Sequence, residues 1–363
     1  MVETGRVTGA SLRVVHRGNE ICARTAGWAD RDAKRPVDDD TIFRLASLTK
    51  ALTSAAAMVA VERRLLAVDA AVRDYLDWFT PSLPDGGESK MTVRHLMTHT
   101  GGLSYGFLGA IDGPYVAAGV SDGLDEGRLD LEENIRRLAK LPLIAAPGER
   151  WNYSLSTDVL GLLLQTVFGK PLQEVIAETV TGPLGMRDTA YVTDPQRLVR
   201  AYYANGEAEA LPMADVQLLP SSSGGRVRYA PGRAVDSGAF PSGGAGMVGT
   251  ARDYIAFLEA MRKGGKPLMS NDFARLMTTD CIAPLEVNSL PPGWGFGLGV
   301  AVMREPAKTG SPLPVGTWRW SGVYGLTYFV DVENQLTVLS MTNTAGTGAK
   351  GHFHDQVIAA VYG

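Results

Sequence analysis

The chain has 363 residues, of which 45% are hydrophobic and 20% are charged, with a formal net charge of −4. This composition is typical of a globular protein and excludes collagen-like repeats and wholesale disorder. No run of Lys or Arg is long enough to mark a phosphate-binding face, so we expect no nucleic-acid partner. The two cysteines, Cys22 and Cys281, cannot form a disulfide framework in a chain of this size. We expect two buried free thiols, with a single bridge as the alternative.

The N-terminal residues lack the basic segment and the apolar segment that make up a secretory signal. The longest apolar stretch, residues 55–61, is too short to span a bilayer. We therefore expect a cytoplasmic protein with no membrane partner, whose oligomeric state the sequence leaves open.

The first elements predicted along the chain are a hairpin and a helix. Leu12 and Val14, then Ile21 and Ala23, alternate with polar residues, and Gly18-Asn19 is a turn signal between them. A helical pattern follows over 47–66, and up to Val61 it carries almost no charged residue. A helix that is apolar nearly all round is a buried helix.

The remaining segments divide into a central helical part and a C-terminal part rich in strands. Gly and Pro loops separate the central helices, and Gly, Pro or Asn bounds each later strand. The predicted helices are 91–99, 131–141, 156–168, 171–186, 251–263 and 355–362, and the predicted strands are 296–303, 315–320, 325–332 and 336–343.

Strands therefore lie at both ends of the chain and helices in its middle. Sequential strands with short links pair antiparallel, and βαβ alternation is absent, so the expected fold class is α+β. We predict one antiparallel sheet built from both chain ends, with flanking helices, in a discontinuous domain of residues 1–76 and 236–363. Residues 77–235 are expected to form an inserted, mostly helical domain, with the active site between the two.

The first candidate chemical site is Ser47-Leu48-Thr49-Lys50, the one Ser-x-x-Lys in the chain. Side chains three residues apart share a helix face, and the N–H groups at a helix start favour developing negative charge. Because burial disfavours the charged form of an amine, this pair suits a nucleophile beside a general base. The alternative is a capping serine with a surface lysine, but Lys50 interrupts a helix that is otherwise apolar.

Two further segments carry candidate residues. Tyr153 stands on a loop between Pro147-Gly148 and a predicted helix, where its phenol could relay a proton or simply pack as a core aromatic. Residues 318–325 form a predicted strand rich in Gly, which could supply a backbone N–H to an oxyanion or merely form a bulge.

Two glycine patterns are judged to be chance matches. Gly102-Leu103-Ser104-Tyr105-Gly106 fits the nucleophile elbow, but that motif requires a preceding strand and a following helix, which are not predicted here. Residues 244–249 fit the dinucleotide fingerprint without the βαβ unit around it.

Two histidine pairs have spacings that a metal ion could use, but neither carries the glutamate of a zinc motif. We interpret them as structural or surface histidines and expect neither a metal nor a cofactor. The pairs are His95/His99 and His352/His354.

Three segments occur in the order of the active-site motifs of the penicillin-recognising serine hydrolases, and they resemble those motifs. This superfamily includes the class C β-lactamases, and the resemblance is nearest to the family VIII carboxylesterases. The segments are 43–50 (Phe-Arg-Leu-Ala-Ser-Leu-Thr-Lys), Tyr153-Ser154-Leu155 and Trp320-Ser321-Gly322, and similar flanking stretches are 96–103, 241–247 and 293–297.

The resemblance implies a serine carboxylesterase that hydrolyses short-chain acyl esters through an acyl-enzyme on Ser47. Lys50 and Tyr153 would shuttle the proton, and the choice of base between them stays open. The backbone N–H groups of Ser47 and Val323 would hold the oxyanion, and the GxSxG around Ser104 would be non-catalytic. The residues expected to contact the substrate, a small ester, are Trp320, Ser321, Gly322 and Tyr105. Relatives usually carry a helix before the first strand, and we expect it to be shortened here.

The sequence departs from the lactamase pattern at two positions. Leu155 replaces the asparagine of the second motif, and Trp320 replaces the lysine that meets the carboxylate of a β-lactam. Loss of such a charge-assisted hydrogen bond costs about 1.5–3 kcal/mol, so we expect a preference for uncharged acyl groups. The alternatives are a β-lactamase or amidase, an acyltransferase on the same site, and a non-catalytic binding module.

Overall fold

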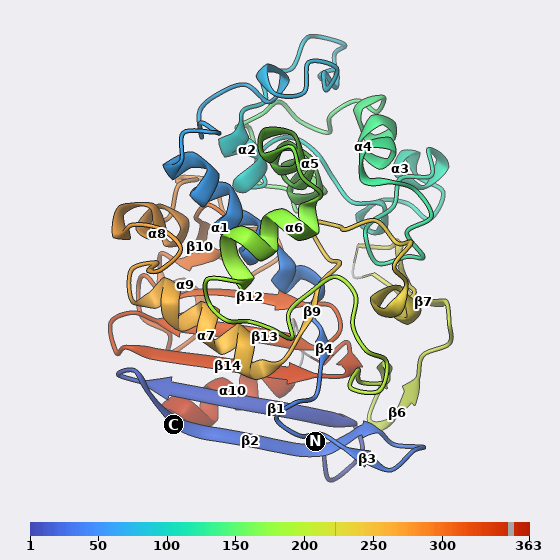
Figure 1. Cartoon of the computed structure of the whole chain (residues 1–363), viewed down its shortest axis with the longest axis vertical. Coiled ribbons are helices and arrows are strands. Elements are labelled where there is room, and N and C mark those ends of the chain that lie inside the picture. The colour runs from blue at the N-terminus through green and yellow to red at the C-terminus, as the bar shows by residue number, and fades with distance from the viewer. Residues whose placement is uncertain (222, 348–351) are drawn as a thin grey trace.

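The computed structural model describes residues 1–221, 223–347 and 352–363, and its centre is an eight-stranded sheet (Figure 1). Neighbouring strands run antiparallel in the order β10-β11-β12-β13-β14-β1-β2-β3. Ala10 of β1 lies opposite Thr342 of β14, so the sheet joins both ends of the chain and the predicted α+β class is confirmed. The strands are β1 (Gly9–His16), β2 (Asn19–Asp30), β3 (Arg35–Pro36), β10 (Trp294–Phe296), β11 (Ala301–Met303), β12 (Trp318–Gly322), β13 (Leu326–Asp331) and β14 (Leu336–Thr342).

Two turns differ from the prediction. The β1–β2 turn is Arg17-Gly18, both with positive φ, and Asn19 already pairs with His16 in the ladder. A two-residue hairpin turn of this hand requires positive φ at both central positions, which Gly18 adopts without strain. The single strand predicted over 296–303 is instead a hairpin, because the chain reverses at 297–300 between β10 and β11.

Two helices cover the inner face of the sheet, and a third covers the outer face. α1 (Thr49–Glu62) is buried from Thr49 to Ala60, as its apolar sequence predicts, and it packs against α5 (Ser156–Phe168). α7 (Ala251–Arg262) lies along β14 and β1 (Figure 1). α10 (His352–Tyr362) lies on the outer face, where His354 Nδ1 is 3.2 Å from Thr327 Oγ1.

The α-helices of the central segment all lie in its first part. Its helices are α2 (Val93–Met97), α3 (Pro114–Ala117), α4 (Leu131–Ala139), α5 and α6 (Leu172–Ile176), the last continuing as a π-turn to Thr181. The mostly helical prediction missed four short strands, β5 (Tyr202–Asn205), β6 (Ala208–Pro212), β7 (Gln217–Pro220) and β8 (Arg226–Tyr229). Strands of four or five residues are too short for a clear alternation signal.

The remaining strands and α-helices have two to eight residues each. They are β4 (Phe43–Arg44), which pairs with β9 (Val248–Gly249), then α8 (Asn271–Thr278), α9 (Pro306–Thr309) and β15 (Thr344–Ala345), which runs parallel to β5. One apolar cluster contains buried residues of both 1–76 and 77–235, and the predicted domain division stays a prediction.

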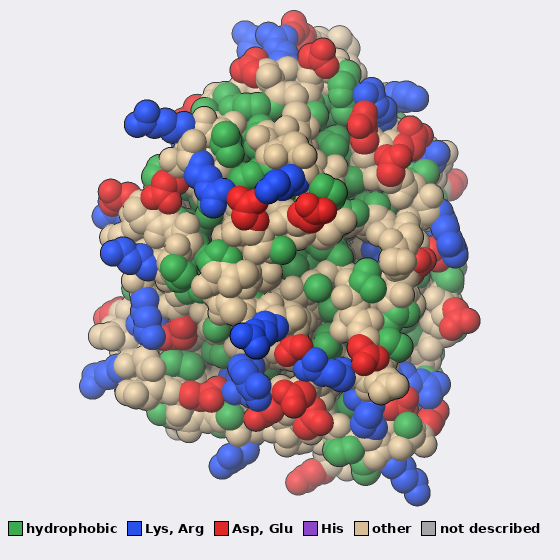
Figure 2. All heavy atoms as spheres, viewed as in Figure 1, with side chains coloured by type: hydrophobic (Ala, Val, Ile, Leu, Met, Phe, Trp, Pro, Cys, Tyr) green, Lys and Arg blue, Asp and Glu red, His purple; other side chains and the backbone are tan. Residues whose placement is uncertain are grey.

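The surface and the cysteines add three observations. Within the described ranges, no helix combines the length and the apolar character needed to cross a lipid bilayer. On the face shown in Figure 2, basic and acidic side chains are interspersed rather than gathered into one patch. Cys22 and Cys281 are free thiols, but the prediction that they are buried is wrong. Both are half-buried. Cys22 lies in β2, a strand whose residues are mostly exposed.

Candidate active site

Ser47 lies in a short 3-10 turn, Ala46–Leu48, which leads directly into α1. Two contacts before the turn fix its position. β4 pairs with β9, and Leu45 N–H donates to Met247 O at 2.9 Å. Ala46 has a φ of 45°, a left-handed conformation that costs a residue with a Cβ about 1–3 kcal/mol. The surrounding structure holds this strain and presents Ser47, 7% exposed, at the helix start.

Lys50 is 2% exposed, which agrees with the prediction that the first turn of α1 is buried. Its Nζ donates to Gly244 O at 2.6 Å and lies 3.4 Å from Ser47 Oγ. It also stands over two aromatic rings, 4.7 Å from the Tyr153 centroid and 5.2 Å from the Tyr105 centroid. The amine is therefore held between a carbonyl, the serine and two π-faces, out of contact with bulk water.

Tyr153 comes from a segment more than a hundred residues away, and its hydroxyl donates to Ser47 Oγ at 2.6 Å. The loop before α5 carries it there, because Asn152 N–H donates to His99 O and Asn152 Nδ2 donates to Leu103 O, both at 2.8 Å. The Trp320 ring packs against the Tyr153 ring with centroids 5.4 Å apart. The predicted meeting of hydroxyl, amine and phenol is thus a feature of the structure.

His99 packs against this tyrosine. Its ring lies 5.1 Å from the Tyr153 ring, and its Nδ1 is 3.2 Å from Ser154 Oγ. Burial and the nearby Lys50 lower the pKa of His99 well below its usual value, so the imidazole stays neutral. His95 instead accepts from Thr92 N–H at the start of α2.

No cluster of three or more potential metal ligands occurs in the part of the chain that the structure describes. His354 bonds with Thr327, as a structural histidine would. The side chain of His352, the other member of that pair, lies outside the described residues.

The end of β12 lies against the nucleophile turn. A Cβ at Gly322 would stand 2.7 Å from Leu45 O and 3.5 Å from the Ala46 Cβ, so only glycine permits this approach. Val323 is the next residue in the chain, and the oxyanion-hole role of its N–H stays a prediction. Ser321 pairs with Thr327 across the β12–β13 ladder.

Trp320 and Tyr105, two residues predicted to contact the substrate, are both buried. Trp320 is 7% exposed and packs among Trp151, Tyr153 and Phe296. Tyr105 is 2% exposed, and burial, together with Tyr153 and nearby carboxylates, raises its pKa well above the usual value. Both rings hold Tyr153 and Lys50 in place, and their predicted contact with a substrate stays a prediction.

The two chance motifs have the surroundings expected of non-catalytic segments. Ser104 lies in a loop with no strand before it, and its Oγ makes only a long 3.5 Å contact to Tyr105 O within the described residues. Residues 244–249 do not open a βαβ unit but enter β9, which pairs antiparallel with β4.

Sequence reasoning missed Asp158 and gave Ser242 no role. Asp158 is the one charged residue in α5 and is fully buried, and its carboxylate accepts from Ser242 Oγ at 2.6 Å. A lone carboxylate in an apolar helix, five residues after Tyr153, is the signal that could have identified it.

Comparison with known proteins agrees with the motifs. The family model described as Beta-lactamase matches residues 1–363. The chain is 43% identical over 362 residues to "Esterase EstB" of Burkholderia gladioli, covering 98% of this chain and 91% of that protein. It is 30% identical over 285 residues to "Monacolin J acid methylbutanoyltransferase" of Aspergillus terreus, covering 72% and 62%.

A solved structure described as "EstCE1, a hydrolase with promiscuous acyltransferase activity" superimposes with a TM-score of 0.95 at 39% identity. The match covers 100% of this chain and 95% of that chain. The predicted resemblance and the predicted fold class are thereby confirmed. The chain belongs to the beta-lactamase family over its whole length.

Proposed function

We propose that this chain is a serine esterase that hydrolyses short-chain acyl esters through an acyl-enzyme on Ser47. The observation that carries the proposal is the convergence of Tyr153 Oη at 2.6 Å and Lys50 Nζ at 3.4 Å on Ser47 Oγ. These groups come from separate segments, and such an arrangement suits a nucleophile with a proton acceptor beside it. The 43% identity to an esterase over nearly the whole chain supports the same activity.

In the proposed reaction, Ser47 Oγ forms a bond to the ester carbonyl carbon while its proton passes to the Tyr153–Lys50 pair. The pair returns that proton to the departing alkoxide, so an alcohol leaves and an acyl-serine remains. Water then attacks the acyl-serine, giving a carboxylic acid and restoring the serine. The N–H groups of Ser47 and Val323 would hold the negative oxygen formed in each step.

The third motif sets the preferred acyl group. Trp320 offers a neutral aromatic ring where lactamases carry lysine, and Leu155 offers no amide to the substrate. The Trp320 ring packs beside Tyr153 and Phe296, which are also uncharged aromatic residues. We therefore propose that uncharged esters are accepted and that β-lactams are poor substrates.

Acyl transfer to an alcohol is the second candidate function. The solved relative at 39% identity is described as a hydrolase with acyltransferase activity, and a curated relative is a methylbutanoyltransferase. The acyl-serine intermediate serves both reactions, which differ only in whether water or an alcohol attacks it. Adding a primary alcohol to the assay and analysing for ester and acid products separates the two.

The experiment that tests the proposal compares Ser47→Ala with Ser104→Ala on p-nitrophenyl butyrate. We expect Ser47→Ala to abolish hydrolysis and Ser104→Ala to retain most of it, because only Ser47 has Lys50 and Tyr153 beside it. The opposite result would assign the activity to the Ser104 elbow. A chromogenic cephalosporin in parallel should be opened far more slowly than the ester, and an equal rate would refute the argument from Trp320.

A further inference from the structure

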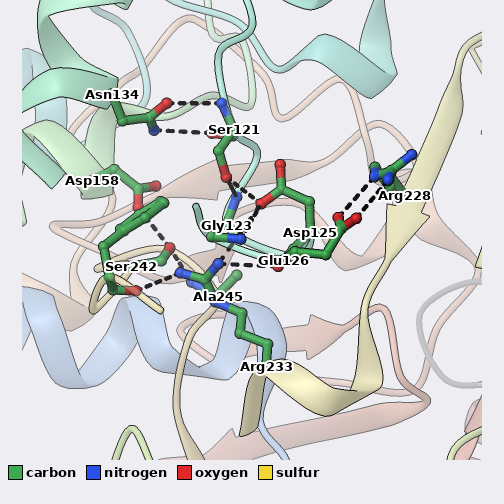
Figure 3. A network of polar contacts seen from close by, with 12 residues as sticks. Ser121, Gly123, Asp125, Glu126, Asn134, Asp158, Arg228, Arg233, Ser242 and Ala245 are labelled. Carbon is green, nitrogen blue, oxygen red and sulfur yellow. Dashed lines mark hydrogen bonds and ion pairs between the residues drawn. The ribbon is translucent and has the colours of Figure 1, made fainter. Parts of the chain in front are cut away.

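The loop formed by residues 242–246 accepts a hydrogen bond from Lys50 at its Gly244 carbonyl, and a buried carboxylate accepts a hydrogen bond from Ser242 of the same loop. Asp158 has no exposed surface, and its Oδ1 accepts from Ser242 Oγ at 2.6 Å (Figure 3). Its Oδ2 has no hydrogen-bond partner among the described residues. A buried carboxylate oxygen that accepts no hydrogen bond destabilises the folded state, so its presence points to a functional role.

The Ser242 hydroxyl links this carboxylate to the backbone of the loop through hydrogen bonds. While its hydroxyl donates to Asp158, its oxygen accepts from Gly244 N–H at 3.2 Å and from Ala245 N–H at 3.1 Å. The turn closed in this way directs Gly244 O at Lys50 Nζ, 2.6 Å away. Thr53 of α1 donates to the neighbouring Gly243 O at 2.8 Å. The loop is therefore hydrogen-bonded both to α1, through Thr53, and to α5, through Asp158.

Three polar side-chain atoms lie close to Gly244. A Cβ there would lie 2.5 Å from Asp158 Oδ2, 3.0 Å from Tyr105 Oη and 3.3 Å from Lys50 Nζ. The three atoms therefore surround the space that a side chain at Gly244 would fill. The unpaired carboxylate oxygen faces the same small volume as the amine.

The loop is also held from the side away from α1. Asn134 binds both backbone groups of Ser121, and Ser121 Oγ accepts from Gly123 N–H at 3.1 Å (Figure 3). Gly123 packs so closely on Ser242 that a Cβ there would collide with its hydroxyl. The Ser242 hydroxyl is thus confined to the orientation that joins Asp158 to the loop.

The charged and titratable groups facing this site are few. His99, Tyr105, Tyr153 and Asp158 face Lys50, so within the described residues Asp158 is the one carboxylate among them. Asp158 is in turn faced by Lys50, Arg233, Asp122, Tyr105 and Tyr191.

We propose that Asp158 is a positioning residue for Lys50, acting through Ser242 and the Gly244 carbonyl. This inference rests on the proposed hydrolysis through Ser47. Loss of the hydrogen bond between Asp158 and Ser242 should therefore displace the Gly244 carbonyl from Lys50 and lower kcat more than it changes KM.

The test compares Asp158→Asn and Ser242→Ala with Asp253→Asn. Asp253 is a matched control, because it is a buried carboxylate that accepts from Asp188 N–H and Thr189 Oγ1 elsewhere in the molecule. Hydrolysis of p-nitrophenyl butyrate is measured between pH 5 and 10, with thermal unfolding of each variant. We expect a kcat loss of about tenfold to a hundredfold in both test variants, with KM within about threefold of wild type. Asp253→Asn should leave both kcat and KM unchanged.

A wild-type kcat in folded Asp158→Asn would overturn the inference, and so would the same loss of kcat in the control. If Asp158→Asn fails to fold, Ser242→Ala decides, and a wild-type kcat there refutes the relay. Failure of the proposed function looks different, because Ser47→Ala would then retain hydrolysis whatever the Asp158 variant does.

Discussion

Replacing Gly322 by Ala tests the proposed oxyanion hole at a close contact between the sheet and the nucleophile turn. The new Cβ would stand 2.7 Å from Leu45 O, whereas ordinary contacts begin at 3.4 Å, so β12 and the turn must separate by about 0.7 Å. A donor displaced by that amount from a usual 2.9 Å separation would stand at about 3.6 Å, beyond hydrogen-bond range. If Val323 N–H is a donor of the proposed oxyanion hole, this displacement takes it out of reach of the oxyanion.

The expected loss follows from this geometry. Removing one oxyanion donor lowers kcat by about 10²–10³-fold, and 10²-fold corresponds to about 2.7 kcal/mol in the barrier. We expect Gly322→Ala to lower kcat for p-nitrophenyl butyrate by about 10²-fold with a small change in KM. Overpacking should also lower the free energy of unfolding by about 1–3 kcal/mol.

Gly232→Ala is the control, since a Cβ at Gly232 meets no atom within 4 Å. Steady-state kinetics and thermal unfolding of both variants, measured beside wild type, separate catalysis from stability. A folded Gly322→Ala variant that keeps kcat within about threefold of wild type would refute the oxyanion argument.

Two further predictions concern the proton shuttle and a buried acid. Tyr153→Phe should lower kcat by about 10²-fold or more while leaving thermal unfolding nearly unchanged, because it removes only the hydroxyl that donates to Ser47; an active variant would leave Lys50 as the base. Burial raises the pKa of Asp122 to about 7, so between the unfolded value of 3.8 and 7 the folded state binds the extra proton and stability falls as pH rises. From pH 5 to 8, the wild type should lose roughly 2–3 kcal/mol of unfolding free energy relative to Asp122→Asn, by denaturant titration; parallel curves would contradict the assigned cause.

Local patterns predicted the regular elements well where a segment was long or strongly apolar. The buried helix around Lys50, the strands over 315–343 and the helix at 251–263 all occur, because each has a clear hydrophobic period. The errors fall where the local signal is short or ambiguous. β5 to β8 have four or five residues each, and the strand predicted over 296–303 is broken by a turn between β10 and β11.

The sequence by itself determined the chemical inventory of the candidate site, since Ser47 and Lys50 lie three residues apart and share one helix start. Only the tertiary structure decided what surrounds them. Tyr153 reaches Ser47 across 106 positions, and the Gly244 carbonyl reaches Lys50 across 194. Contacts over such separations depend on how α1, α5 and β12 pack and on glycines that allow close approach, and no local propensity encodes them. The role proposed for Asp158 also depends on tertiary contacts, because the 242–246 loop is hydrogen-bonded to α1 through Thr53 and to α5 through Asp158.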